Sequence, residues 1–225
     1  LDWAQANPGR FTYPAPPDFT GSVFLREALV AVSGGPQNVP LQFSRQAYDR
    51  LTPTLFDRLN ALKPALWRGG TTYPQTAGEL NDLYAGGQVD MTMTYGPATL
   101  TELVADGTYP PQTRVLTLTG GTVGNASFLA VPSTSGSTAG ARVVANLALS
   151  PGQQLEKAKP QVWGQFTVLD LSRLTETDRA AFEALPGSPV VPPYDVLARN
   201  AHAELAAGWV APLDEGWRRT VLAGG

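Results

Sequence analysis

The stretch Phe-Thr-Tyr-Pro-Ala-Pro-Pro-Asp-Phe-Thr-Gly-Ser, residues 11–22, joins a short extended run to a proline-rich turn and a helix start made of small residues. The first N–H groups of an α-helix have no partner within the helix and carry a partial positive charge, so they can hold anionic or carbonyl groups. Glycine lets such a group approach the backbone closely. The stretch predicts a small-molecule site at Thr20, Gly21 and Ser22, with an ordinary helix cap as the alternative.

Helical and extended segments alternate over the first 131 residues. Apolar residues at helical spacing, together with glycine and proline stops, predict helices over residues 24–32, 45–67, 76–85 and 98–105. Runs of β-forming residues predict strands over residues 89–95, 114–119 and 126–131. This alternation is typical of an α/β unit with a largely parallel sheet.

The sequence after Val131-Pro132 is mostly helical. Helices are expected over residues 139–149 and 176–185, from Ser150 onward, and near the C-terminus over residues 212–221. We therefore divide the chain into an α/β lobe, residues 1–131, and a mostly helical part, residues 132–225.

Composition limits the classes of function. The 225 residues suffice for one large domain or two small lobes, and 43% of them are hydrophobic. A formal net charge of −3 without any basic run argues against nucleic acid as a partner. The chain has no cysteine, which excludes disulfides and thiol chemistry, and no apolar run of membrane-spanning length, so no membrane insertion is expected. The N-terminus, Leu-Asp-Trp-Ala, lacks the features of a signal peptide, so the leader of an exported protein would lie upstream.

Motifs for catalysis, metals and cofactors are missing from the sequence. His202 is the only histidine, and nothing near it resembles a nucleophile elbow, so we expect a structural or exposed role for it. No set of residues has metal-ligand spacing, and no phosphate-binding or dinucleotide-binding glycine motif occurs. No cofactor is therefore predicted. Catalysis by a pair of acids stays open, because distant carboxylates can meet in a fold.

Three loops are expected to converge on a ligand. They are residues 20–22, residues 94–96 at the end of a predicted strand, and residues 122–125. Ligands in open α/β sheets bind beyond the carboxyl ends of strands. Tyr95 offers an apolar ring with one hydroxyl, and Asn125 offers a donor and an acceptor. The alternatives are that Tyr95 packs in the core or at its rim and that Asn125 is a turn residue.

Several stretches in order resemble one family. Residues 83–95 (LYAGGQVDMTMTY), 120–132 (GGTVGNASFLAVP) and 141–154 (ARVVANLALSPGQQ) resemble segments of type II extracellular solute-binding proteins of ABC transporters. Residues 11–22 and 162–170 (VWGQFTVLD) resemble the YnjB-type branch of that family. The resemblance covers essentially the whole chain.

The resemblance implies a non-catalytic binding protein of two α/β lobes that closes on a solute and presents it to ABC permease subunits. It implies a periplasmic or extracellular location and a monomeric full-length protein. Thr20, Gly21 and Ser22 match the first ligand-facing loop of the second lobe, Thr94 and Tyr95 match the strand-end position, and Asn125 lies at the crossing loop near the cleft.

Such proteins normally begin with a strand-rich segment of the first lobe, and that segment is missing before residue 11. We therefore expect a C-terminal fragment: a complete type II lobe followed by the mostly helical C-terminal part of the other lobe. The helices after Val131 would then pack differently or expose an apolar patch that drives self-association. The solute and its charge stay open.

Two other classes of function remain as alternatives. One is a hydrolase that uses acids such as Asp18 or Asp90. The other is the effector-binding domain of a regulator, which shares the two-lobed architecture but would need a DNA-binding segment that is not seen in this sequence.

Overall fold

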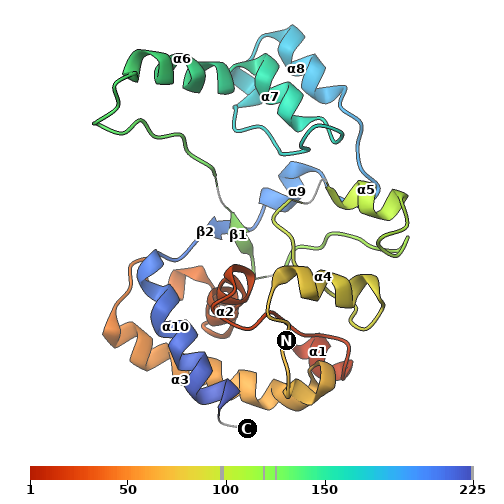
Figure 1. Ribbon diagram of the computed structural model, residues 1–225, viewed down its shortest axis with the longest axis vertical. Helices are drawn as coiled ribbons and strands as arrows, with labels where there is room; N and C mark the ends of the chain where they lie inside the picture. Colours follow the sequence, from red (N-terminus) through yellow and green to blue (C-terminus); the bar gives the residue numbers. More distant parts are fainter. Residues whose placement is uncertain (97–98, 119, 125, 224–225) are drawn as a thin grey trace. The chain divides into compact units, whose positions relative to one another are not determined.

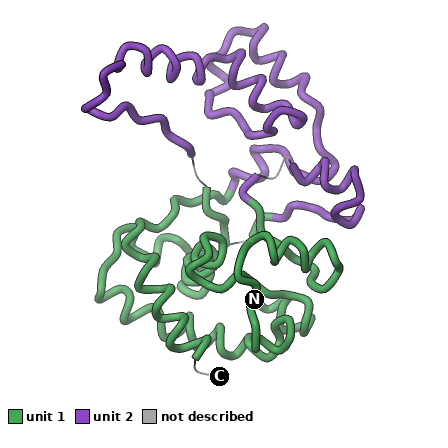
Figure 2. The backbone as a smooth tube through the Cα atoms, viewed as in Figure 1, with its two compact units in different colours: residues 1–94, 117–124, 200–225 green, residues 95–116, 125–199 purple. Residues whose placement is uncertain are grey.

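The computed structural model describes residues 1–96, 99–118, 120–124 and 126–223. The chain forms two compact units, each made from separated segments (Figure 2). Unit 1 contains Leu1–Thr94, Thr117–Gly124 and Asn200–Gly225, and unit 2 contains Tyr95–Leu116 and Asn125–Arg199. These units differ from the expected division at residue 131, because the C-terminal segment packs on the N-terminal helices of unit 1.

Unit 1 is built mainly from helices (Figure 1). Its elements in chain order are α1 (Asp2–Ala6), α2 (Phe19–Val32), η1 (Pro36–Asn38), α3 (Arg45–Leu62), η2 (Lys63–Ala65), η3 (Trp67–Gly70), α4 (Ala77–Ala85), β1 (Thr122–Gly124), β2 (Ala201–Ala203), η5 (Ala207–Trp209), α10 (Val210–Trp217) and η6 (Arg218–Leu222).

Unit 2 is also mainly helical. Its elements in chain order are α5 (Thr99–Ala105), α6 (Thr138–Ala148), α7 (Pro151–Ala158), η4 (Leu171–Arg173), α8 (Glu176–Glu183) and α9 (Tyr194–Ala198). Within this unit α7 packs against both α6 and α8.

The helices expected from sequence periodicity are confirmed, whereas the expected strands are wrong. Among the described residues, the sheet consists of β1 and β2, paired in parallel with Val123 opposite His202. The segments 89–95, 114–118 and 126–131 are irregular, and residue 119, the end of the second expected strand, lies outside the described residues. The first two segments make isolated backbone bonds instead of a ladder: the Asp90 amide donates to the Arg10 carbonyl and the Val115 amide to the Val190 carbonyl. The fold is therefore mixed α/β but mostly helical.

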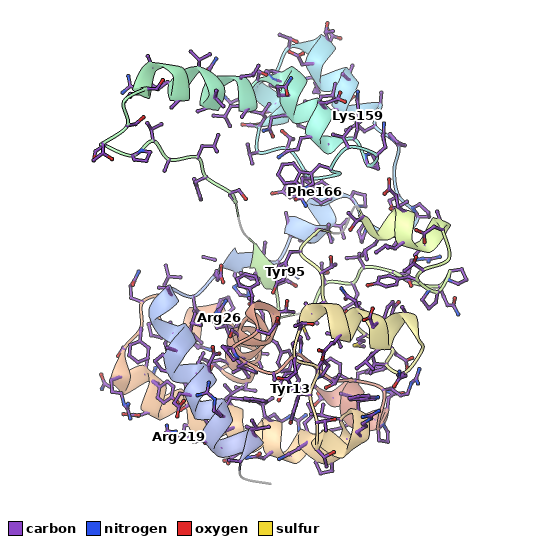
Figure 3. The ribbon with its side chains drawn as sticks, viewed as in Figure 1. Tyr13, Arg26, Tyr95, Lys159, Phe166 and Arg219 are labelled. Atoms are coloured by element: carbon purple, nitrogen blue, oxygen red, sulfur yellow. The ribbon has the colours of Figure 1, made fainter. Side chains whose placement is uncertain are left out.

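The core of unit 1 gathers around α2. Apolar side chains of α2, α3 and α10 are buried against one another, and they include Leu25, Leu29, Leu55, Leu59, Leu62, Leu213 and Trp217. Tyr13 precedes α2 and is fully buried (Figure 3). Its hydroxyl accepts a hydrogen bond of 2.9 Å from Trp217 Nε1, and its ring stacks on Phe24 with 4.1 Å between centroids. The extended run before α2 is thus fixed by the C-terminal helix.

Helices α3 and α10 approach closely at Gly216. A Cβ atom at this position would lie 2.3 Å from the Tyr48 hydroxyl and 2.6 Å from Phe56 Cζ. The same Tyr48 hydroxyl donates to the Pro212 carbonyl at 3.0 Å. A side chain at residue 216 would therefore push the two helices apart.

Replacing Gly216 with alanine should destabilise the protein by ~1–3 kcal/mol, because overpacking forces neighbouring side chains and backbone to move. Urea unfolding measures this as a lower midpoint at unchanged slope. Gly78→Ala in α4 is the matched control, since a Cβ there meets only ordinary contact at 3.5 Å. Equal stability of the two variants would contradict a tight contact at Gly216.

In unit 2 the turn between α6 and α7 is held by Gln154. Its side-chain nitrogen donates to the Ala148 carbonyl at 2.7 Å, and its oxygen accepts from Thr167 Oγ1 and from the Val168 amide, each at 3.2 Å. Ser150 caps α7 by accepting from the Gln153 amide. The Ser-Pro-Gly-Gln-Gln stretch therefore ties residues 162–170 to the helices.

Helix α6 exposes apolar side chains. None of its residues is buried, and Val143, Val144 and Leu147 are more than half exposed. Phe128 and Leu129, which precede it, are also exposed. Exposed apolar patches of this kind mark surfaces that associate. In the part of the chain that the structure describes, no helix is both long and apolar enough to cross a membrane.

We expect the chain to bind an apolar fluorescent dye at α6 and to elute in size-exclusion chromatography as more than a monomer. Glutamine at both Val143 and Leu147 should lower the dye fluorescence without lowering the unfolding midpoint, because both side chains are more than half exposed. Arg142→Gln, also on α6, is the control and should leave fluorescence unchanged. Monomeric elution without dye binding would contradict self-association through this patch.

Candidate functional site

The predicted site residues at the start of α2 are buried and have partners within the chain. The Asp18 carboxylate accepts from the amides of Thr20 at 2.9 Å and Gly21 at 3.1 Å, and the Ser22 amide donates to the Asp18 carbonyl at 2.8 Å. A Cβ at Gly21 would lie 2.2 Å from the Pro14 carbonyl oxygen. An ordinary helix cap, and a close approach between two backbone segments, account for these residues.

The other predicted residues fall in different parts of the chain. Thr94 belongs to unit 1 and Tyr95, which is half exposed, to unit 2. Asn125 lies outside the described residues. Within unit 1, Ser22 lines a hollow to which Thr94 does not contribute.

This hollow has a volume of about 380 Å³ and lies beside the first two turns of α2. Its lining combines apolar side chains, a hydroxyl and two opposite charges: Phe19, Ser22, Arg26, Glu204, Leu205 and Val210 are among the residues that form it. A small concave site with a few polar groups is the usual form of a ligand pocket.

Arg26, labelled in Figure 3, is the positively charged residue among those that line the hollow. Its side chain is 4% exposed, and its Nη2 donates to Glu204 Oε1 at 2.6 Å. Its Nε and Nη1 are buried and have no hydrogen-bond partner among the described residues. Buried donors without acceptors cost free energy, so Arg26 would gain from another acceptor.

Asp214 is a second buried charged residue and contacts Ser22, which lines the hollow. The Ser22 hydroxyl lies 2.9 Å and 2.8 Å from its two carboxylate oxygens and can donate its single proton to one of them at a time. Burial raises the pKa of Asp214, while the Ser22 hydrogen bond and the charges of Arg26 and Arg218 oppose this rise. The serine predicted to face a ligand therefore stabilises an ionised side chain.

Glu27 adds a third carboxylate near Arg26. Burial raises its pKa, and the nearby His202, the Val123 amide and Arg26 oppose the rise. His202 Nε2 lies 3.4 Å from Glu27 Oε2, in poor geometry for a hydrogen bond, and its side chain is largely buried. The single histidine links β2 to α2.

A second hollow in unit 1, of about 370 Å³, is lined in part by Trp67, Arg68 and Glu79. The Arg68 guanidinium lies 4.2 Å from the centre of the Trp67 ring, and Glu79 accepts from the Gln75 amide at 2.7 Å. In this second hollow, the Trp67 ring and the Glu79 carboxylate therefore already have partners within the chain. The described residues include no group of three or more side chains that could hold a metal ion.

Sequence reasoning missed Arg26, Glu204 and Asp214. One signal was available: Arg26 interrupts the apolar face formed by Leu25 and Leu29. A charged side chain on a helix that is buried along much of its length requires a partner. Nothing in the sequence identified that partner as a residue 178 positions away.

The comparisons give one clear similarity. The chain is 35% identical over 217 residues to Protein YnjB of Escherichia coli (strain K12), which covers 96% of this chain and 54% of YnjB. This similarity supports a YnjB-like family. The chain spans about half the length of YnjB. No family model and no solved structure matches it.

Ser22→Ala should destabilise the protein by ~1–3 kcal/mol at neutral pH, because the buried Asp214 carboxylate loses its donor. The pKa of Asp214 in the folded protein lies above its ordinary value of 3.8. Ionisation of Asp214 therefore lowers the free energy of unfolding as the pH rises from 3.8 through the folded pKa, and the Ser22 hydrogen bond offsets part of this loss. The penalty of the variant should therefore shrink as pH falls to 3.8, where Asp214 becomes protonated.

Urea unfolding of the wild type and of Ser22→Ala, at neutral pH and at pH 3.8, measures how the penalty of the substitution depends on pH. Ser44→Ala removes another helix-associated serine, the cap of α3, without touching a carboxylate, and its penalty should not depend on pH in this window. A penalty for Ser22→Ala that is equal at the two pH values would show that the hydroxyl does not stabilise ionised Asp214.

Proposed function

We propose that the chain is part of the solute-binding component of an ABC importer, which captures a small molecule and delivers it to a membrane permease without converting it. The observation that carries this proposal is the hollow beside α2, whose lining includes the buried Arg26 guanidinium. Buried polar groups that converge on an otherwise apolar hollow are what ligand recognition requires.

The finer parts of the proposal come from the family resemblance. They are a type II lobe, closure of two lobes on the solute, location in the periplasm or outside the cell, and a monomeric full-length protein. Similarity to YnjB over 217 residues supports a common origin of the two chains, and the name of that protein states no activity. Each of these parts therefore belongs to the proposal.

The roles of two acids favour binding over hydrolysis. Asp18 caps α2, and Asp90 pairs with Arg10, whose Nε lies 2.9 Å from Asp90 Oδ2. The hydrogen bond from Arg10 lowers the pKa of Asp90, so this carboxyl is ionised and is a poor proton donor at neutral pH. Both acids singled out for hydrolysis thus have structural partners.

A binding screen tests the proposal. Thermal-shift measurements of the chain with thiamine, spermidine, ferric citrate, phosphate and the natural amino acids should give a saturable rise of the unfolding temperature for at least one compound, because a ligand that binds the folded state stabilises it. Mass spectrometry should recover that compound unchanged after prolonged incubation.

Glu204→Gln removes a negative charge from the lining, so it should weaken the binding of a cation or a zwitterion and strengthen that of an anion. Asp49→Asn on α3 should have no effect. Conversion of the bound compound would replace a binding function with a catalytic one. Failure of every compound to shift the unfolding temperature would contradict solute binding by this chain.

A further inference from the structure

The hollow beside α2 presents both signs of charge and an apolar wall, and we infer that its ligand is a small zwitterion with a carboxylate, an ammonium group and an apolar side chain, as in an apolar α-amino acid. This inference rests on the proposed solute-binding function and names the chemical class of the solute.

The carboxylate would bind Arg26. This guanidinium uses one nitrogen on Glu204, while its Nε and Nη1 have no acceptor among the described residues. A guanidinium offers donors in a planar fork that matches the two oxygens of a carboxylate. The Glu204 side chain is 32% exposed, so its rotation toward solvent would open Arg26 to the hollow.

The ammonium group would bind Glu204 in that rotated position. The ligand carboxylate then replaces Glu204 on Arg26, while the ligand ammonium pairs with the displaced carboxylate. The single pair of Arg26 with Glu204 is replaced by two pairs, one between Arg26 and the ligand carboxylate and one between Glu204 and the ligand ammonium. The ligand adds no net charge to the buried region. The exchange therefore avoids the cost of burying an unpaired charge.

Ligands with a single charge fit this lining less well. An anion would meet Arg26 but also the Glu204 carboxylate, and a cation would meet Glu204 but also the buried guanidinium. Like charges close together in a partly buried site repel. A zwitterion places each of its charges against a group of opposite sign.

The remaining lining suits an apolar side chain. Phe19 is 62% exposed and presents its ring, and Leu205 and Val210 belong to the same wall. The volume of about 380 Å³ lies at the small end of ligand pockets, which favours a single amino acid over a peptide.

Three matched compounds test the inference by calorimetry on the wild-type chain: L-phenylalanine, hydrocinnamate, which lacks the amino group, and phenethylamine, which lacks the carboxylate. L-Phenylalanine should bind at least ~10-fold more tightly than either analogue, because each analogue loses one charge-assisted contact. The comparison needs no substitution, so folding of a variant cannot obscure it.

Two variants then assign the contacts. Glu204→Gln keeps an acceptor for Arg26 but removes the charge, so it should reduce the advantage of L-phenylalanine over hydrocinnamate. Arg26→Lys should reduce its advantage over phenethylamine, because a single ammonium cannot bind both carboxylate oxygens in the same plane. Asp49→Asn on α3 is the control and should leave all three affinities unchanged.

Equal binding of phenethylamine would overturn the inference in favour of a cation site, and equal binding of hydrocinnamate in favour of an anion site. If none of the three compounds binds while thiamine, spermidine, ferric citrate or phosphate does, the zwitterion is wrong and solute binding stands. If no compound of either set binds, both proposals fail.

Discussion

A buried arginine in the central helix requires acids from the far end of the chain. Arg26 lies on α2 among leucines of the core, where an isolated charge would be costly. Its partner Glu204 is 178 residues away, and Asp214, which holds Ser22 of the same helix, is 192 residues away from that serine. Unit 1 therefore needs both ends of the chain, and the two segments of unit 2 lie between them in the sequence.

The apolar core imposes the same closure. Trp217 donates to the hydroxyl of Tyr13 across 204 residues, and Gly216 allows α10 to lie directly on α3. These contacts bury the largest side chains of unit 1 around α2. Hydrophobic burial holds α10 in place, and the buried hydrogen bond between Ser22 and Asp214 fixes how α10 faces α2.

Local signals predicted the helices but not the sheet or the site. Apolar spacing and caps such as Ser44 and Thr76 act within one or two turns, so α3 and α4 follow from the sequence. A strand needs a neighbour, and the run from Val89 to Tyr95 is rich in β-forming residues yet has no paired ladder, because its partners are single groups such as the Arg10 carbonyl. The acids around Arg26 could not be predicted, since ion pairs across 178 residues leave no periodic trace.

At the start of α2 the groups left to bind a ligand are side chains and not the backbone amides that the sequence suggested. The sequence suggested that its free amides hold an anion, but the Asp18 carboxylate already occupies two of them, and Pro14 fills the space above Gly21. The positive end of the helix is thus neutralised by the chain itself. What remains for a ligand lies up to one turn further along the same helix, where Ser22 and Arg26 face the hollow. A guanidinium there differs from a helix terminus in that its present acceptor, Glu204, is a side chain able to rotate. Binding at Arg26 can therefore exchange one carboxylate for another without unfolding any part of α2.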